Sequence, residues 1–252
     1  MAAELSRVLV ESRPDGTALV TLNRPEALNA LDGELLDALG NAFRGLDACA
    51  VVLTGAGRAF CTGADLKARA EMGPAEWREH YEALREAFAA VRECPVPTIA
   101  AIEGFALAGG LELALACDLI VAAAGARLGL PEVTRGIMPG AGGTKALPRL
   151  VGAGRARDLI FTGRQLDAET ALAWGLVDVV AKKGGLDDAV ENTVKTLLEC
   201  GSEALRIQKE LLRQWEELPL TESVNLSVGV FGRSFLTGEP QQLMQAFLNR
   251  KK

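Results

Sequence analysis

The feature that most constrains the fold of this sequence is an apolar tract that runs from Ile99 to Ala124. The tract is long enough to span a bilayer, but it contains Glu103, Glu112, Asp118 and three glycines. A carboxylate at the centre of a membrane-spanning helix costs about 3 kcal/mol. We therefore expect no membrane span, and the glycines divide the tract into a strand, a turn, a buried helix and a second strand.

Short apolar runs alternate with helical patterns through about residue 185. Strands are expected at 8–12, 17–22, 50–57, 97–104, 118–123 and 176–180, and helices at 31–43, 73–94, 109–117 and 166–175. This alternation predicts an α/β core with mostly buried strands. From Gly185 the pattern is helical to the end. The segment 219–240 is too apolar for a free arm, so we expect it to pack on a partner surface.

Charge and cysteine content limit the partners and the cellular compartment that can be expected for this chain. The net charge of -6 argues against nucleic acid or an anionic membrane as a partner. The five cysteines are an odd number, scattered and without a CxxC pair, which predicts buried free thiols in a reducing cytoplasm. The first sixteen residues lack the apolar core of a signal peptide, so we expect a cytoplasmic location.

Two acids are candidates for a chemical role. On a helix, Glu112 has no basic residue three or four positions away, so no local salt bridge can neutralise it. It is either a buried group that a distant arginine or backbone amides satisfy, or a functional acid with a raised pKa. Glu132 follows Pro131 at the start of a short helix. Taken alone, Glu132 is best interpreted as a surface carboxylate, with Arg135 as its candidate partner.

Two glycine-bearing turns, "LTGAGRAFCTGADL" and "IEGFALAGGLEL", each lead from a strand into a helix. Free N–H groups at such a start can bind an anion, although tight turns alone also explain the glycines. Neither turn has P-loop or dinucleotide spacing, and "GAGGTK" from Gly140 has neither. The single histidine, His80, lies in the charged run "REHYE" and is expected to be solvated. A Ser-His hydrolase and a metal site are therefore not expected.

Five ordered blocks together resemble the enoyl-CoA hydratase/isomerase (crotonase) family. They are "TLNRPEALNAL", "FCTGADLK", "IEGFALAGGLELALACDLIVAA", "LGLPEVTRGIMPGAGGT" and "FLTGEPQQLMQAFLNR". The resemblance implies an α/β crotonase (ClpP-like) spiral of ββα units with a C-terminal helical trimerisation region. It places the spiral core and its acyl-CoA site in residues 1–200 and the oligomerisation region in 201–252. It also implies a homotrimer or a dimer of trimers.

The resemblance assigns roles to particular residues. The amides of Ala64 and Gly109 match an oxyanion hole for a thioester oxygen. The positions that match the substrate and coenzyme A site are Arg24, Ala27, Leu28, Ala64, Asp65, Leu66, Lys67 and Gly109. Coenzyme A is part of the substrate, so no separate cofactor is implied. In this family, the helix from Met72 to Cys94 and the loop before it shape the acyl pocket.

The pair Glu112 and Glu132 distinguishes members of the family. Hydratases carry both acids, whereas isomerases that shift the double bond usually retain only the second. The resemblance therefore implies an enoyl-CoA hydratase that adds water syn across a trans-2-enoyl-CoA, with both glutamates catalytic. Alternatives are a Δ3,Δ2-enoyl-CoA isomerase, a branched-chain (methylglutaconyl-CoA) hydratase, a non-catalytic acyl-CoA-binding oligomer and an RNA-binding protein. One departure is Ala108, where the family often has glycine, and only a local packing change is expected from it.

Overall fold

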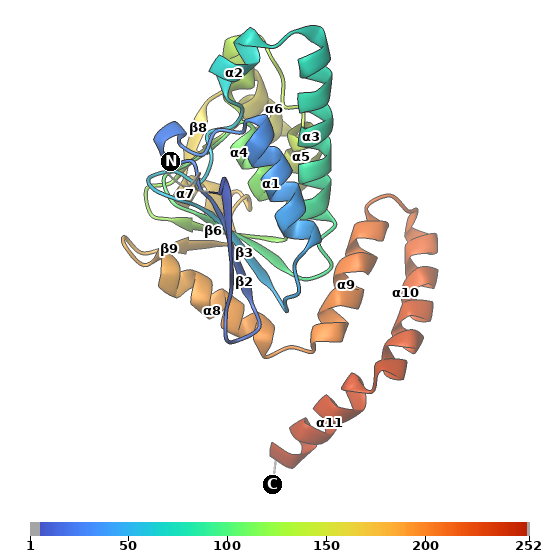
Figure 1. The fold of residues 1–252 in the computed structure, drawn as a ribbon. Helices are drawn as coiled ribbons and strands as arrows, with labels where there is room; N and C mark the ends of the chain where they lie inside the picture. The colour runs from blue at the N-terminus through green and yellow to red at the C-terminus, as the bar shows by residue number, and fades with distance from the viewer. Residues whose placement is uncertain (1–5, 251–252) are drawn as a thin grey trace.

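A six-stranded sheet forms the centre of the computed structural model, which describes residues 6–250 (Figure 1). Its strand order is β1-β2-β3-β4-β6-β9, with β1 antiparallel to β2 and the other neighbours parallel. The strands are β1 (Val8–Ser12), β2 (Ala18–Leu22), β3 (Val51–Gly55), β4 (Thr98–Ile102), β6 (Leu119–Ala123) and β9 (Val179–Ala181). The predicted α/β core is thus present.

Side chains on the central strands are buried on both faces of the sheet. In β3, Val51 and Leu53 belong to the larger apolar cluster, which includes residues of helices α1 (Gly33–Arg44) and α3 (Pro74–Arg92). Val52 belongs to a smaller cluster with residues of α8 (Leu186–Leu198). Because both faces are covered, the strands read in the sequence as continuous apolar runs rather than as alternating ones.

A second sheet has three strands, in the order β5-β7-β8. Its strands are β5 (Phe105–Leu107), β7 (Arg127–Gly129) and β8 (Gln165–Asp167). The remaining helices of the core are η1 (Pro25–Ala27), α2 (Leu66–Glu71), α4 (Gly109–Leu115), η2 (Pro131–Arg135), α5 (Gly143–Val151), α6 (Ala153–Thr162) and α7 (Ala168–Ala173). Strands of three residues are too short for a periodic signal, which explains why the sequence did not predict this sheet.

The last part of the chain is helical, as predicted, and extends away from the core (Figure 1). It consists of α9 (Ser202–Trp215), α10 (Leu220–Ser234), η3 (Phe235–Thr237) and α11 (Glu239–Arg250). The Lys209 ammonium fastens α9 to the core, because it lies 2.6 Å from Asp118 Oδ2. The same carboxylate accepts the amide and the hydroxyl of Thr98. Asp118 therefore serves the fold, in agreement with the structural role that its sequence position predicts.

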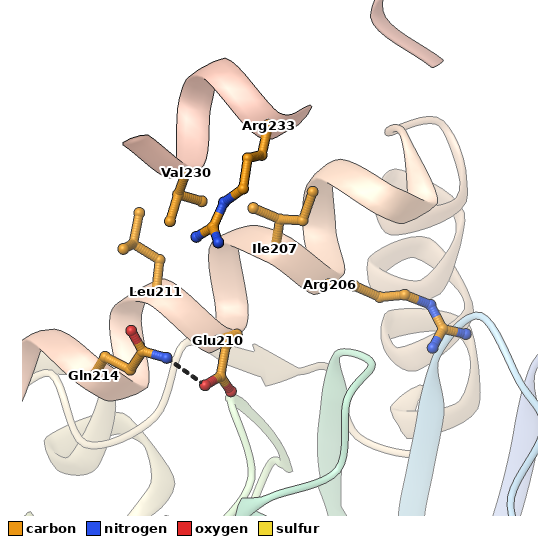
Figure 2. A pocket seen from close by; sticks show the side chains of 7 residues that line it. All are labelled: Arg206, Ile207, Glu210, Leu211, Gln214, Val230 and Arg233. Atoms are coloured by element: carbon orange, nitrogen blue, oxygen red, sulfur yellow. Dashed lines mark hydrogen bonds between the residues drawn. The ribbon is translucent and has the colours of Figure 1, made fainter. Parts of the chain in front are cut away.

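Apolar side chains on these last helices stay uncovered in the single chain. Leu220 is 82% exposed, Leu236 is 85% exposed and Phe231 is 66% exposed. A groove of about 300 Å³ lies between α9 and α10, lined by Leu211 and Val230 among others (Figure 2). None of the helices within residues 6–250 is both long and apolar enough to cross a membrane.

Two predictions about burial are wrong. His80 is 5% exposed rather than solvated, because it lies on the same face of α3 as the buried Leu84, Ala87 and Phe88. The spacing of four residues between His80 and Leu84 could have shown this. All five thiols are free, but Cys49 and Cys200 are exposed and Cys117 is partly exposed; only Cys61 and Cys94 are buried.

Candidate active site

Glu112 projects from α4 and is held by the loop that begins α5. Its side chain is buried, and Oε1 accepts the amides of Ala141 and Gly143, each at 2.8 Å. The loop 140–143 is the "GAGG" stretch, in which Gly142 has a φ of 114°. Of the two partners expected for a buried Glu112, the backbone amides are the ones present.

Opposing effects act on the ionisation of Glu112. Burial is the largest and raises the pKa of its carboxyl above the usual value. The amides of Gly143, Ala141 and Gly140 and the charge of Arg69 act in the opposite direction. Glu112 is therefore a carboxyl fixed in orientation and more basic than an exposed one, as a general base requires.

Glu132 has a different environment, although it is equally buried. It lies in η2 with 5% exposure, and neither Oε1 nor Oε2 has a hydrogen-bond partner. Burial, with a smaller contribution from the charge of Glu112, raises the pKa of Glu132 to about 7. The interpretation of Glu132 as a surface carboxylate paired with Arg135 is wrong, because the Arg135 guanidinium donates to Thr134 and Pro131 instead. Glu132 is thus a carboxyl that can exchange a proton near neutral pH.

Two backbone amides, those of Ala64 and Gly109, lie next to each other without an acceptor among residues 6–250. Ala64 forms a parallel bridge with Leu31, but the two hydrogen bonds of this bridge run from the Leu31 amide to the Gly63 carbonyl and from the Asp65 amide to the Leu31 carbonyl. Gly109 is the first residue of α4, so its N–H has no partner within the helix. Two adjacent N–H groups without a protein acceptor are able to bind an oxyanion.

Close backbone packing brings these two amides together. The segment at Cys61 pairs with β5, since the Leu107 amide donates to the Cys61 carbonyl at 3.0 Å. Gly110 lies so close that an added Cβ would be 2.0 Å from that carbonyl oxygen. Gly63, at φ 88°, would bring a Cβ within 3.0 Å of the Gly109 nitrogen. The glycines in the two turns therefore permit a close approach as well as a tight bend.

Ala108 has a strained backbone conformation, whereas only a local packing change is expected from the sequence. Its φ of 51° and ψ of -127° are glycine-like values. Ala108→Gly is expected to stabilise the protein by about 1 kcal/mol, since relief of about 1–3 kcal/mol of strain outweighs the greater freedom of the unfolded chain. Urea unfolding would measure this gain. Ala108→Val is the opposing control, and a loss of stability in Ala108→Gly would contradict the prediction.

The residues expected to bind coenzyme A fall into an ion-paired group and an exposed group. The Arg24 guanidinium lies 2.7 Å from Asp65, whose carboxylate also caps α2 by accepting the amides of Lys67 and Ala68. Leu28 follows η1 in a left-handed conformation, and its carbonyl accepts the Thr62 amide. The structure therefore joins the segments 24–31 and 61–68, with Leu66 and Lys67 exposed.

Arg69 is a charged residue near Glu112 and Glu132, and the sequence alone does not point to it. Its guanidinium lies over the ring of Trp77, with 5.0 Å between Cζ and the ring centroid. Burial lowers the pKa of Arg69, and the charges of Glu112 and Glu132 raise it. The "DLKARA" pattern gives no sign that this arginine lies inward. Within the described part of the chain, no cluster of histidine, cysteine or acidic residues could hold a metal ion.

Together these groups can move protons beside a stabilised oxyanion. Glu112 supplies a fixed base and Glu132 a carboxyl that can be protonated near pH 7. The amides of Ala64 and Gly109 supply two donors for a developing negative charge. This combination fits proton transfer at carbons next to a carbonyl group.

Several known proteins are similar to this chain in both sequence and fold. A family model described as enoyl-CoA hydratase/isomerase matches residues 12–252. The short-chain-enoyl-CoA hydratase of Clostridium acetobutylicum is 35% identical, over 99% of this chain and 97% of that protein. A probable enoyl-CoA hydratase of Rhizobium meliloti is 38% identical, over 97% and 96%. The crystal structure of enoyl-CoA hydratase from Bacillus anthracis is 36% identical, with a TM-score of 0.93 over 97% of this chain and 96% of that one.

Proposed function

The chain belongs to the enoyl-CoA hydratase/isomerase family, and from this premise we propose that it adds water syn across the 2,3 double bond of a trans-2-enoyl-CoA, giving a 3-hydroxyacyl-CoA. The observation that carries the proposal is the presence of two buried, electrostatically coupled glutamates, Glu112 and Glu132. An isomerase or a binding protein does not require both. The predicted crotonase architecture is confirmed by the match to the hydratase structures.

The oxyanion is the first element of the mechanism. When an oxygen nucleophile attacks C3 of the enoyl thioester, negative charge moves to the thioester oxygen. The free amides of Ala64 and Gly109 would each donate a hydrogen bond to that oxygen. One donor of this kind is typically worth about 10²–10³ in kcat.

The two glutamates supply the proton transfers. Glu112 holds the water and takes its proton as the oxygen bonds to C3, while Glu132 gives its own proton to C2. Glu112 and Glu132 are both buried and their charges interact, and we assign them to one side of the substrate, so that both new bonds form on the same face of the double bond. This step leaves Glu112 protonated and Glu132 ionised, so a proton must pass from Glu112 back to Glu132 before the next turnover. Over the whole turnover one water adds to one enoyl-CoA, with no oxidation or reduction. The reaction therefore needs no cofactor beyond the coenzyme A of the substrate.

Positioning of the coenzyme A part rests on the segments 24–31 and 61–68. Arg24 and Asp65 form an ion pair between the two segments and so neutralise each other. We therefore propose that this pair holds the segments beside the Ala64 amide. The exposed Lys67 is the residue available for a phosphate of coenzyme A. Ala27, Leu28 and Leu66 complete the proposed binding surface.

The decisive assay for function supplies two isomeric substrates. With crotonyl-CoA, the proposal predicts loss of the ultraviolet absorbance of the conjugated thioester and formation of 3-hydroxybutyryl-CoA. With a 3-enoyl-CoA, rapid conversion to the 2-enoyl-CoA without a hydroxyacyl product would identify an isomerase instead. Binding of both thioesters without turnover would identify an acyl-CoA-binding protein.

The pH dependence of hydration is expected to have an alkaline limb near pH 7. Hydration begins with Glu132 protonated and Glu112 ionised, and burial raises the pKa of Glu132 to about 7. As the pH rises through 7, Glu132 loses the proton that it must deliver, so kcat/KM falls. The limb belongs to the coupled pair rather than to one residue. Initial rates between pH 5 and pH 9, on enzyme shown to be folded throughout, would measure it.

The reverse reaction is the control for this assignment. Hydration takes up and releases no net proton, so the equilibrium constant does not depend on pH in this range. Dehydration of 3-hydroxybutyryl-CoA must therefore show the same limb in kcat/KM. A profile that stays flat through pH 9 would contradict the role of Glu132.

For assembly, we propose that α9, α10 and α11 mediate a homotrimer or a dimer of trimers. Support comes from the exposed Leu220, Phe231 and Leu236 and from the groove between α9 and α10. Burial of such side chains is the usual driving force for association. The free thiols support a reducing compartment, and we propose the cytoplasm. A mass measurement in solution would separate trimer from hexamer.

A further inference from the structure

Asn29 is a fully buried polar residue that the proposed mechanism does not use. It lies in the turn between η1 and α1, and its exposed fraction is 0%. Leu28 has a φ of 54° and Asn29 a φ of 55°, so two consecutive residues other than glycine are in the left-handed region. Such values are uncommon, although asparagine tolerates them better than most residues. Strained backbone persists only where its surroundings fix it, and it is concentrated at functional sites.

The side-chain amide of Asn29 joins two segments of the chain. Oδ1 accepts the backbone amide of Arg24 at 2.9 Å, which closes the turn that follows β2. Nδ2 donates to the carbonyl oxygens of Ala56, at 3.0 Å, and Ala59, at 2.8 Å. Both hydrogens of the Nδ2 group are therefore used, and they fix the loop that follows β3 to this turn.

The end of β3 leaves room for this side chain only because its last residue is Gly55. A Cβ added there would lie 2.6 Å from Nδ2 of Asn29 and 2.3 Å from the carbonyl oxygen of Phe60. The Phe60 amide in turn donates to the Glu103 carbonyl at 2.8 Å, beyond the end of β4. The loop is thus held from two sides just before the segment that carries Ala64.

Leu31 follows in the same turn and lies beside both proposed oxyanion donors. Its amide donates to the Gly63 carbonyl at 2.8 Å, and its carbonyl accepts the Asp65 amide at 3.1 Å. These two bonds fix the residues on either side of Ala64 and leave the Ala64 amide free. The Leu31 side chain also lies next to Gly109, where an added Cβ would be 3.2 Å from Cδ1.

We propose that Asn29 is a positioning residue for the oxyanion site, because its side chain fixes both the turn that carries Leu31 and the loop that leads to Ala64. This inference rests on the proposed hydratase function and adds to it a residue that does not touch the substrate. Two amides stabilise one oxygen only when both are directed at it. A displacement of about 1 Å at such a site can cost about 10²-fold in rate.

Asn29→Gly tests the role of the three hydrogen bonds, because glycine adopts the left-handed conformation without strain. We expect kcat for crotonyl-CoA hydration to fall about 10–100-fold, since the bonds to the oxyanion strengthen as its charge develops. KM should change by less than about threefold, because the loss falls on the transition state. Asn29→Asp keeps the shape and the acceptor for the Arg24 amide but loses the two donations, so kcat should fall in this variant as well.

The stretching frequency of the bound thioester carbonyl separates a positioning role from a structural one. The ligand is butyryl-CoA with an isotopic label in its thioester carbonyl, and hydrogen bonds to the carbonyl oxygen lower this frequency. Only folded protein binds the ligand, so the frequency does not depend on the folded fraction. In wild type we expect a lower frequency than in the free ligand, and in both Asn29 variants a shift back towards the free value.

Thr98→Ala is the matched control. Thr98 is also 0% exposed, and its hydroxyl donates to Asp118 at 2.8 Å, but it is the first residue of β4 and the oxyanion site lies beyond the last. Urea unfolding should show a loss of stability for Thr98→Ala as for Asn29→Gly. Only the Asn29 variants should change kcat and the carbonyl frequency.

The outcomes distinguish this inference from the proposed function. Wild-type kcat and carbonyl frequency in a folded Asn29 variant would overturn the inference, as would equal changes in Thr98→Ala. If neither Asn29 variant folds, the residue serves the fold and the inference is wrong. Failure of the wild-type protein to hydrate crotonyl-CoA would instead overturn the hydratase function, and the carbonyl frequency would still test whether Asn29 positions the two amides.

Discussion

Glu112→Gln and Glu132→Gln are each expected to lower kcat for crotonyl-CoA hydration by about 10²–10⁴-fold. The amide keeps the size of the side chain but can neither take the proton of water nor deliver one to C2. In Glu112→Gln, the amide oxygen can still accept the N–H groups of Ala141 and Gly143, so the fold of the loop is retained. Steady-state rates, with binding of the unreactive butyryl-CoA as a measure of site integrity, would check both variants.

Glu132→Gln is also expected to change how stability depends on pH. The folded-state pKa of Glu132 is raised from 4.5 to about 7, so wild-type stability falls as the pH rises across that interval. Glutamine does not ionise, and Glu132→Gln should therefore unfold at higher urea concentration than wild type at pH 8 but not at pH 4. Glu103→Gln, at an exposed position in the same apolar tract, is the control for both measurements. If either site variant kept more than a tenth of wild-type kcat, the catalytic role of that residue would be wrong.

Gly110→Ala is expected to cost at least about 3 kcal/mol of stability, at the upper end of overpacking effects. The new Cβ would lie 2.0 Å from the Cys61 carbonyl oxygen and 2.6 Å from its carbon, and a backbone cannot rotate away as a side chain can. The Cys61 segment must move, which separates the amides of Ala64 and Gly109. We therefore also expect kcat to fall by about 10²–10³-fold in the protein that remains folded.

A matched substitution controls for the loss of glycine itself. Gly154 is in α6 with no atom within 4 Å of an added Cβ, so Gly154→Ala should be neutral or slightly stabilising. Urea unfolding and kcat on the two variants would separate crowding from chain flexibility. A Gly110→Ala protein with wild-type stability and rate would show that the close approach does not matter.

Elements with long periodic patterns could be predicted from the sequence. The helix at α3, the run of buried strands and the helical C-terminal region all follow from spacing and apolar runs. The three short strands of the second sheet could not be predicted, because their pairing joins segments far apart in the chain. Burial of His80 was detectable from its spacing to Leu84, but its charged neighbours in the sequence concealed it.

For the site, the sequence predicted the residues but not their surroundings. Glu112 stood out because nothing near it in the sequence could neutralise it, whereas Glu132 became a candidate only through the family resemblance. Neither the sequence spacing nor the family resemblance indicates that the loop 140–143 holds Glu112 or that Arg69 lies near both acids. These contacts join different elements, so they depend on the folded packing rather than on any local pattern.

The contact between Glu112 and loop 140–143 also limits how such an enzyme can evolve. A lineage that lost Glu112 while keeping Glu132 would leave the buried amide of Gly143 and the partly buried amide of Ala141 without an acceptor. Each such orphan costs about 1–3 kcal/mol. The loop must then be rebuilt along with the acid. A change of reaction on this scaffold is therefore expected to require linked substitutions some thirty residues apart in the chain.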